Sequence, residues 1–280
     1  MQLHAIETGR FKLDGGAMFG VVPKVLWQRT NPSDENNRID MAARCLLIED
    51  NNRLILIDTG IGTKSDSKFA ANYAIDNRIT LDISLEKLGF TRKDITDVIL
   101  THLHFDHCGG STEWEIPGEK ARPAFVNANY YVQKNHLTWA LSPNPREKAS
   151  FLNENIQPLV SSGQLIELEQ NADLFPWMEL IVINGHTEAQ QLPLITWNNK
   201  KYLFAADLFP TVGHLPLPFV MSYDVRPLVT LSERLPILES AAQGEFYLFL
   251  EHDPIHECVE VIKNEKGGFT AGEKFNLTDN

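Results

Sequence analysis

A short segment of the sequence, residues 101–110 (Thr-His-Leu-His-Phe-Asp-His-Cys-Gly-Gly), concentrates side chains that bind metal ions. Three histidines and one aspartate fall within six residues: His102, His104, Asp106 and His107. Imidazole nitrogen and carboxylate oxygen are donor atoms that zinc, manganese and iron accept. The residue types and their spacing therefore predict a metal site rather than a polar loop with scattered histidines.

The surroundings of this segment indicate how it is positioned. The largely apolar, β-branched run 97–100 predicts a buried strand, and Gly109-Gly110 predicts a turn. The segment is then a loop at the carboxyl end of a strand, where sites tend to form in open α/β sheets. Residues two apart in an extended chain share a face, so His102 and His104 can point at one cation. A bend after His104 can direct the side chains of Asp106 and His107 at a second cation.

The segment resembles the His-x-His-x-Asp-His signature of the metallo-β-lactamase fold superfamily. The resemblance implies three further ligands downstream: a histidine after a strand, an aspartate after a strand, and a late histidine. His186, Asp207 and His252 occur in that order, and each follows a run that predicts a strand, at 180–183, 202–206 and 246–250. A buried carboxylate such as that of Asp207 is costly unless it is paired or bound to metal.

The resemblance also assigns a role to each candidate. Two divalent cations are implied, zinc first, with manganese or iron as alternatives. His102, His104 and His186 would hold one, Asp106, His107 and His252 would hold the other, and Asp207 would bridge them. Asp58, in the segment Asp58-Thr59-Gly60, would orient ligands through hydrogen bonds.

Length and ligand spacing predict the architecture. The chain has 280 residues, and candidate ligands from 102 to 252 require one domain over residues 1–280. Alternating strand and helix patterns predict an α/β protein, with strands at 3–13, 41–49 and 53–58 and helices at 81–90 and 151–159. The segment Thr230-Leu231-Ser232-Glu233 has the pattern of a capping box, which predicts a helix start. The resemblance implies a four-layer αββα sandwich.

Composition excludes several function classes. The net charge of -12 disfavours nucleic acid as a partner. No apolar run is long enough for a membrane helix, and no signal peptide is visible. The three cysteines are odd in number and far apart, which favours reduced thiols in a cytoplasmic protein.

Two further segments are candidates for the substrate pocket. Residues 14–27 are rich in glycine and large apolar side chains without a helical period, and are expected to lack regular structure. Met18, Phe19 and Trp27 would line an apolar pocket as a flap, pack into the core as a loop, or form a homodimer contact. Residues 208–226 form a long loop with His214 and Tyr223 as polar tips.

The sequence start, the ligand set and the apolar segment are similar to the acyl-homoserine lactone lactonase and organophosphate hydrolase branch. This implies a metal-bridging hydroxide that attacks the carbonyl or phosphoryl centre of a small molecule, a lactone or ester with an apolar part. Lactonases of this branch carry a tyrosine soon after the bridging aspartate. Here Leu208 follows, so that role is vacant or passes to Tyr223 or His214, with Asp106 as a candidate for proton transfer.

Because the sequence departs from the family pattern, more than one substrate class is compatible with it. Many members continue the second motif with Pro-Gly-His, whereas this chain has Glu188-Ala189-Gln190-Gln191 after Thr187. A thioester hydrolase of the glyoxalase II type shares the ligand set but carries a basic helical domain that is not visible here. A diiron redox protein of the same fold is the third alternative.

Overall fold

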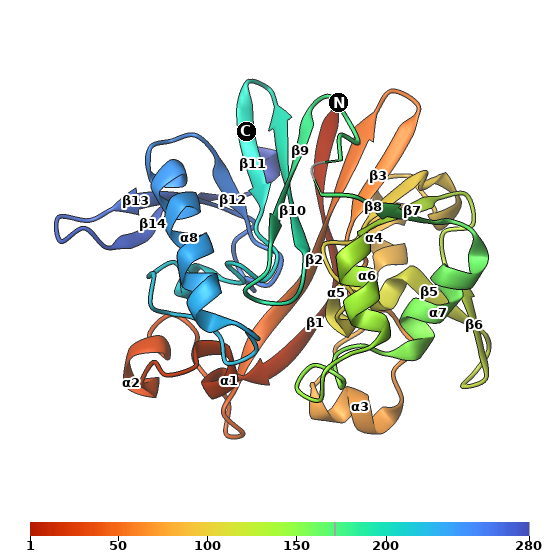
Figure 1. The fold of residues 1–280 in the computed structure, drawn as a ribbon, viewed down its shortest axis with the longest axis horizontal. Helices are drawn as coiled ribbons and strands as arrows, with labels where there is room; N and C mark the ends of the chain where they lie inside the picture. Colours follow the sequence, from red (N-terminus) through yellow and green to blue (C-terminus); the bar gives the residue numbers. More distant parts are fainter. Residues whose placement is uncertain (171, 280) are drawn as a thin grey trace. The chain divides into compact units, whose positions relative to one another are not determined.

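The computed structural model describes residues 1–170 and 172–279. The chain forms two compact units, and each unit is built from two separate segments (Figure 1). Unit 1 comprises Met1–Arg10 and Ala43–Ala172, and unit 2 comprises Phe11–Ala42 and the chain from Asp173 onward. The long strands β1 (Gln2–Asp14) and β2 (Arg38–Asp50) each cross this division. The predicted mixed α/β class is confirmed.

Most of one six-stranded sheet lies in unit 1, in the order β1-β2-β3-β4-β7-β8. Its other strands are β3 (Arg53–Ile57), β4 (Asp97–Ile99), β7 (Asn129–Gln133) and β8 (Leu165–Leu168). β2 and β3 form the predicted hairpin, with Asn51 at a positive φ of 52° in the turn. β3, β4, β7 and β8 run parallel to one another. β4 is buried along its whole length, as its apolar residues Val98 and Ile99 predict.

The helices that the structure describes in unit 1 are short. They are α3 (Ser67–Asn72), α4 (Leu81–Lys87), α5 (Phe105–Cys108), α6 (Lys134–Leu141) and α7 (Asn153–Ser162), with 3-10 turns η1 (Arg92–Asp94) and η2 (Gly109–Ser111). A separate hairpin, β5 (Thr112–Ile116) and β6 (Lys120–Pro123), packs against α7 (Figure 1). Buried residues of α4, β4, β7 and α7 share one hydrophobic core, which fixes β4 and the loop that follows it.

Unit 2 contains the second six-stranded sheet, in the order β14-β13-β12-β11-β10-β9. Its strands are β9 (Met178–Ile183), β10 (Gln190–Trp197), β11 (Lys200–Phe204), β12 (Tyr247–Phe249), β13 (Cys258–Lys263) and β14 (Phe269–Phe275). Only the pair β11–β12 is parallel among the pairings described in this sheet. The long helix α8 (Pro227–Ala242) packs on β13 (Figure 1). The remaining elements are the 3-10 turns η3 (Val212–His214) and η4 (Leu277–Asp279).

The glycine-rich segment differs from the sequence prediction. It contains two short helices, α1 (Gly15–Phe19) and α2 (Lys24–Trp27), because Asp14 caps the first by accepting from the Ala17 amide at 2.8 Å. Met18, Phe19 and Trp27 are buried within unit 2, where the rings of Phe19 and Trp27 stack with centroids 5.3 Å apart. This burial agrees with the core-packing alternative, although the segment is helical rather than a loop.

The capping-box prediction is also wrong. α8 begins at Pro227, so Thr230 lies inside the helix, and its hydroxyl donates to the Arg226 carbonyl at 3.4 Å. Glu233 instead accepts hydrogen bonds from the amides of Asn184 and Gly185, at 2.7 and 2.9 Å. It thereby ties α8 to the loop before His186. A helix that spans a bilayer needs about 20 mainly apolar residues, and none of the helices in residues 1–170 and 172–279 meets this requirement.

Candidate metal centre

The predicted ligands leave their strands at a constant interval. His102, His186, Asp207 and His252 each lie three residues beyond the end of a strand, after Ile99, Ile183, Phe204 and Phe249 respectively. In unit 2, Phe204 and Phe249 are direct partners in the parallel pair β11–β12. This pairing brings Asp207 and His252 to the same edge of their sheet, as expected for parallel strands.

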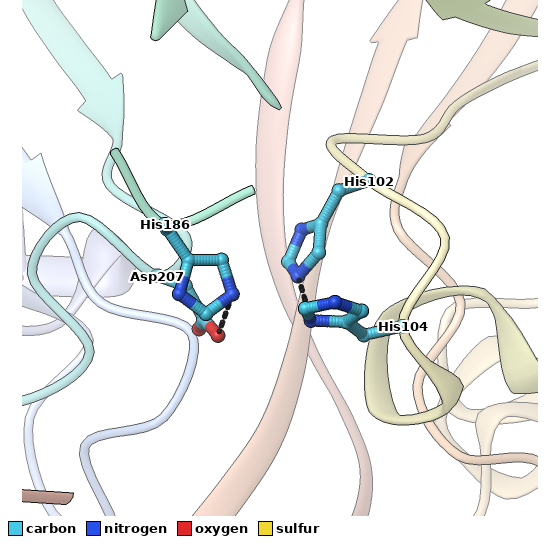
Figure 2. Close-up of side chains that lie close together, drawn as sticks. All are labelled: His102, His104, His186 and Asp207. Carbon is cyan, nitrogen blue, oxygen red and sulfur yellow. Dashed lines mark hydrogen bonds and ion pairs between the residues drawn. The ribbon is translucent and has the colours of Figure 1, made fainter. Parts of the chain in front are cut away.

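In unit 1, His102 and His104 lie together after β4. His102 Nε2 and His104 Nδ1 are 3.1 Å apart, and both side chains are buried (Figure 2). Two donors that each bind a tetrahedral cation at about 2.1 Å lie roughly 3.4 Å apart, so this pair is close to the spacing of two ligands of one ion. The prediction that both histidines point the same way is confirmed.

The bend that was expected after His104 is the helical turn α5. It turns Asp106 and His107 so that His107 Nε2 lies 3.8 Å from Asp106 Oδ2. The ring of His107 also packs on that of His102, with centroids 3.9 Å apart. The whole signature is thus compact within unit 1.

Asp58 orients this loop through hydrogen bonds, as predicted. Its carboxylate is fully buried and accepts from both the amide and the hydroxyl of Thr101, at 2.8 and 2.6 Å. The same oxygen that binds the hydroxyl also accepts from His107 Nδ1 at 3.2 Å. Asp58 adopts a positive φ of 56°, an uncommon conformation that the surrounding hydrogen bonds maintain.

In unit 2, Asp207 lies between two histidines. Its Oδ2 atom is 3.1 Å from His186 Nε2 (Figure 2), and its Oδ1 atom is 3.0 Å from His252 Nε2. Ala206 before it has a φ of 40°, again strained for a residue with a side chain. One carboxylate therefore presents a different oxygen to each histidine, which suits a group that bridges two cations.

His186 is surrounded by negative charge. Its Nδ1 atom donates to Asp224 Oδ1 at 2.9 Å. Burial opposes protonation of the ring, but Asp207 and Asp224 outweigh it and raise the pKa of His186 to about 10. Carboxylates that favour a proton on this ring also favour a metal cation beside it.

The five candidate histidines share one feature. In each ring, the outward nitrogen, which is the one not assigned to a metal, has a hydrogen-bond or ion-pair partner. For four of them this is Nδ1, which donates to Thr101 Oγ1 (from His102), Asp58 (from His107), Asp224 (from His186) or the Ala42 carbonyl (from His252). His104 is the exception, since its Nε2 faces Glu147 Oε1 at 3.5 Å. Such outer partners fix the tautomer that leaves the inner nitrogen as a metal donor.

Several residues that support the ligands were not singled out from the sequence. Asp224 and Glu147 are carboxylates far along the chain from the histidines that they contact. His136 is also buried, and its Nε2 accepts from the Leu103 amide at 2.8 Å. It therefore fixes the backbone between His102 and His104. No local pattern distinguishes these residues from other polar side chains.

The two residues proposed for the loop 208–226 have different environments. His214 is buried rather than a polar tip: its Nε2 donates to the Met18 carbonyl at 2.9 Å, and its ring stacks on Phe19. Thr211 Oγ1 lies 2.8 Å from its other nitrogen. These contacts anchor the loop to α1. Tyr223 is 38% exposed and adjoins Asp224, and its catalytic role stays a prediction.

Comparison with known proteins identifies relatives of this arrangement. Residues 39–240 match the model of the metallo-beta-lactamase superfamily. An N-acyl homoserine lactonase from Bacillus sp. is 27% identical over 169 residues, covering 56% of this chain and 59% of that protein. The chain thus matches less than two thirds of that relative.

Solved structures resemble the chain over nearly its whole length. A probable metal-dependent hydrolase from Staphylococcus aureus has a TM-score of 0.88 and 28% identity, covering 98% of each chain. AidC, described as a dizinc quorum-quenching lactonase and solved with a product, has a TM-score of 0.81 and 23% identity, covering 98% of this chain and 95% of its own. The second likeness concerns the fold alone.

Proposed function

Because the chain belongs to the metallo-β-lactamase superfamily, we propose that it is a dinuclear metal-dependent hydrolase. The two units together would form one catalytic domain. His102, His104 and His186 would hold the first cation, and Asp106, His107 and His252 the second. Asp207 would bridge them. The order of these residues in the family signature supports the assignment.

The observation that carries the proposal is the geometry around Asp207. Its two oxygens face two different histidines at 3.1 and 3.0 Å, and those histidines are the ones assigned to different cations. The donor set fits zinc, since imidazole nitrogens predominate and carboxylate oxygens complete it. The description of AidC as a dizinc lactonase is consistent with the same metal here.

Bound divalent cations supply Lewis acidity and lower the pKa of water, which is the chemistry of hydrolysis at neutral pH. The chain's own residues hold this centre in place. Asp58 and Asp224 accept from ligand histidines, and buried surroundings limit the access of bulk water. Asp106 remains the candidate for moving a proton, because its carboxylate belongs to the same short helical turn as the candidate ligand His107.

We further propose that the substrate is a lactone or ester with an apolar part. The lactonase activity of the Bacillus relative supports the reaction class. A pocket of about 450 Å³ in unit 1 offers apolar walls from Phe69, Phe105, Trp114 and Leu152, together with the charged side chains of Lys64, Asp66 and Glu154. Phe105 lies between His104 and Asp106 in the chain, and it packs edge-on against Phe69 with centroids 5.0 Å apart. The acidic net charge of -12 favours an uncharged substrate over a polyanion.

The experiment is a hydrolysis panel on zinc-loaded protein. It would compare acyl lactones, aryl esters, thioesters and phosphotriesters, with Asp207→Ala as the inactive control. We expect kcat/KM to be highest for lactones or esters with an apolar chain. Higher kcat/KM values for thioesters than for lactones and esters would instead favour a thioester hydrolase of the glyoxalase II type. The absence of any metal-dependent hydrolysis, together with oxygen consumption by the iron-loaded protein, would overturn the proposal in favour of a redox protein.

A further inference from the structure

His104 is held differently from the other four candidate ligands. Its outward nitrogen is Nε2 rather than Nδ1, and this atom faces Oε1 of Glu147 at 3.5 Å. Both side chains are nearly inaccessible, with 8% exposed for His104 and 3% for Glu147. A buried carboxylate beside an imidazole is costly unless the pair shares charge or hydrogen bonds.

The carboxylate of Glu147 is held in place by donors on its other oxygen. Trp139 Nε1 and Asn144 Nδ2 both donate to Oε2, at 2.7 and 2.5 Å. Asn144 also accepts from the amide of Glu147 itself, at 3.2 Å, which closes a tight turn. Oε1 is thereby directed at His104.

The backbone of the same turn is tied to the metal loop. The Ser150 amide donates to the Glu147 carbonyl at 2.7 Å, and the Ser150 carbonyl accepts from the Phe105 amide at 2.9 Å. Phe105 directly follows His104. The segment 144–150 and the ligand loop therefore form one hydrogen-bonded assembly within unit 1, although they are about forty residues apart in sequence.

We propose that Glu147 is a positioning residue for His104: it holds the imidazole as the Nε2–H tautomer so that Nδ1 binds metal, and it adds negative charge to that cation site. This rests on the metal assignment proposed above. A cation at Nδ1 makes the Nε2–H group a stronger donor, so the contact with Glu147 strengthens when metal binds.

The test measures cobalt affinity by competition with a chelator, together with the visible spectrum of the cobalt-loaded protein. Glu147→Gln keeps the size of the side chain but removes its charge. We expect about 10–100-fold weaker cobalt binding and an altered ligand-field spectrum. Glu169→Gln, a neutralisation of a glutamate that is exposed and pairs with Lys134, is the matched control and should bind as the wild type does. Trp139→Phe, which keeps the charge, should weaken binding less than Glu147→Gln.

The outcomes separate this inference from the proposed function. If His104→Ala loses cobalt while Glu147→Gln binds within threefold of the wild type, the role of Glu147 is refuted and the metal assignment stands. If His104→Ala retains all its cobalt, the metal assignment itself fails. A second measurement needs no Glu147 variant: nitrogen NMR of labelled histidines in the zinc-loaded wild type, with His104→Gln for assignment. A protonated Nε2 on His104 supports the proposal, and a protonated Nδ1 overturns it.

Discussion

Asp207 Oδ2 lies 3.1 Å from His186 Nε2, and the two side chains come from loops that follow β11 and β9. Asp224 contacts the opposite nitrogen of the same imidazole at 2.9 Å. The ring is thus fixed between two carboxylates. Only one of them, Asp207, has a second histidine, His252, on its other oxygen. This difference fits the proposed roles, in which Asp207 belongs to the metal centre and Asp224 supports it.

Replacing Asp207 should therefore affect metal content as well as turnover. In Asp207→Ala two cations would lack the anion that offsets their repulsion. We expect metal content to fall below one per chain and kcat to fall at least 100-fold. Asp207→Asn should fold more like the wild type but remain damaged, because a neutral amide cannot offset charge. Wild-type metal content in the alanine variant, measured by mass spectrometry of the metals, would show that the assignment is wrong.

The aromatic residues beside the metal loop should contact the apolar part of the substrate and so determine the preference for chain length. Phe69→Ala should lower kcat/KM about 10–200-fold for long acyl or aryl substrates, and less for short ones. Phe19→Ala is the comparison, since Phe19 is buried against Trp27 and His214 in unit 2. It should cost about 3–5 kcal/mol of stability without a preference for chain length. A chain-length effect in the Phe19 variant alone would contradict this division of roles.

His214 should make the protein sensitive to acid. Burial lowers the pKa of His214 from 6.5 to about 3, and the charge of Arg234 adds to the effect. Between these values the unfolded chain binds a proton that the folded chain excludes. The free energy of unfolding should therefore decrease as pH falls from about 6.5 towards 3, by up to about 1.4 kcal/mol per pH unit.

Urea unfolding at several pH values isolates this contribution. His214→Phe loses the hydrogen bonds to Met18 and Thr211 and should be less stable than the wild type at pH 8. The difference in the free energy of unfolding between the wild type and this variant should shrink as pH is lowered from 6.5 to 4, because phenylalanine does not titrate. A deficit that stays constant over that range would show that His214 is not buried in its neutral form.

Gly185 should not tolerate a side chain. A methyl group there would lie 2.4 Å from the backbone nitrogen of Thr230 in α8. We expect Gly185→Ala to lose about 1–3 kcal/mol of stability and to displace His186, the next residue. Thr230→Ala in the same background should not restore it, since the backbone clash remains. Full rescue by that second change would place the conflict at the side chain instead.

The clustering of the candidate ligands could be predicted because these residues lie close together in sequence or directly follow strands. His102, His104 and His107 lie within one short signature, and the later ligands follow apolar strands at a fixed interval. The supporting carboxylates could not be predicted. Glu147 and Asp224 meet their histidines only through the folded turns at 144–150 and 221–224, and acidic residues are common along the chain.

Two errors in the fold prediction have identifiable physical causes. Thr230 and Glu233 have the spacing of a capping box, but Pro227 begins α8 one turn earlier, a position that proline favours. Residues 14–27 have no helical period, yet two short helices form there. Their stability comes from the Asp14 cap and from burial of Phe19 and Trp27, and burial is a tertiary effect that periodicity does not contain.

The most direct test of the central claim is the zinc content of the purified protein. The protein would be saturated with zinc, passed into metal-free buffer and measured by inductively coupled plasma mass spectrometry, with protein concentration from amino-acid analysis. Five histidines and two aspartates, of which Asp207 would be shared by both cations, predict close to two zinc ions per chain. The His252→Ala variant should retain close to one. A wild-type content of one zinc, unchanged in His252→Ala, would contradict the dinuclear centre.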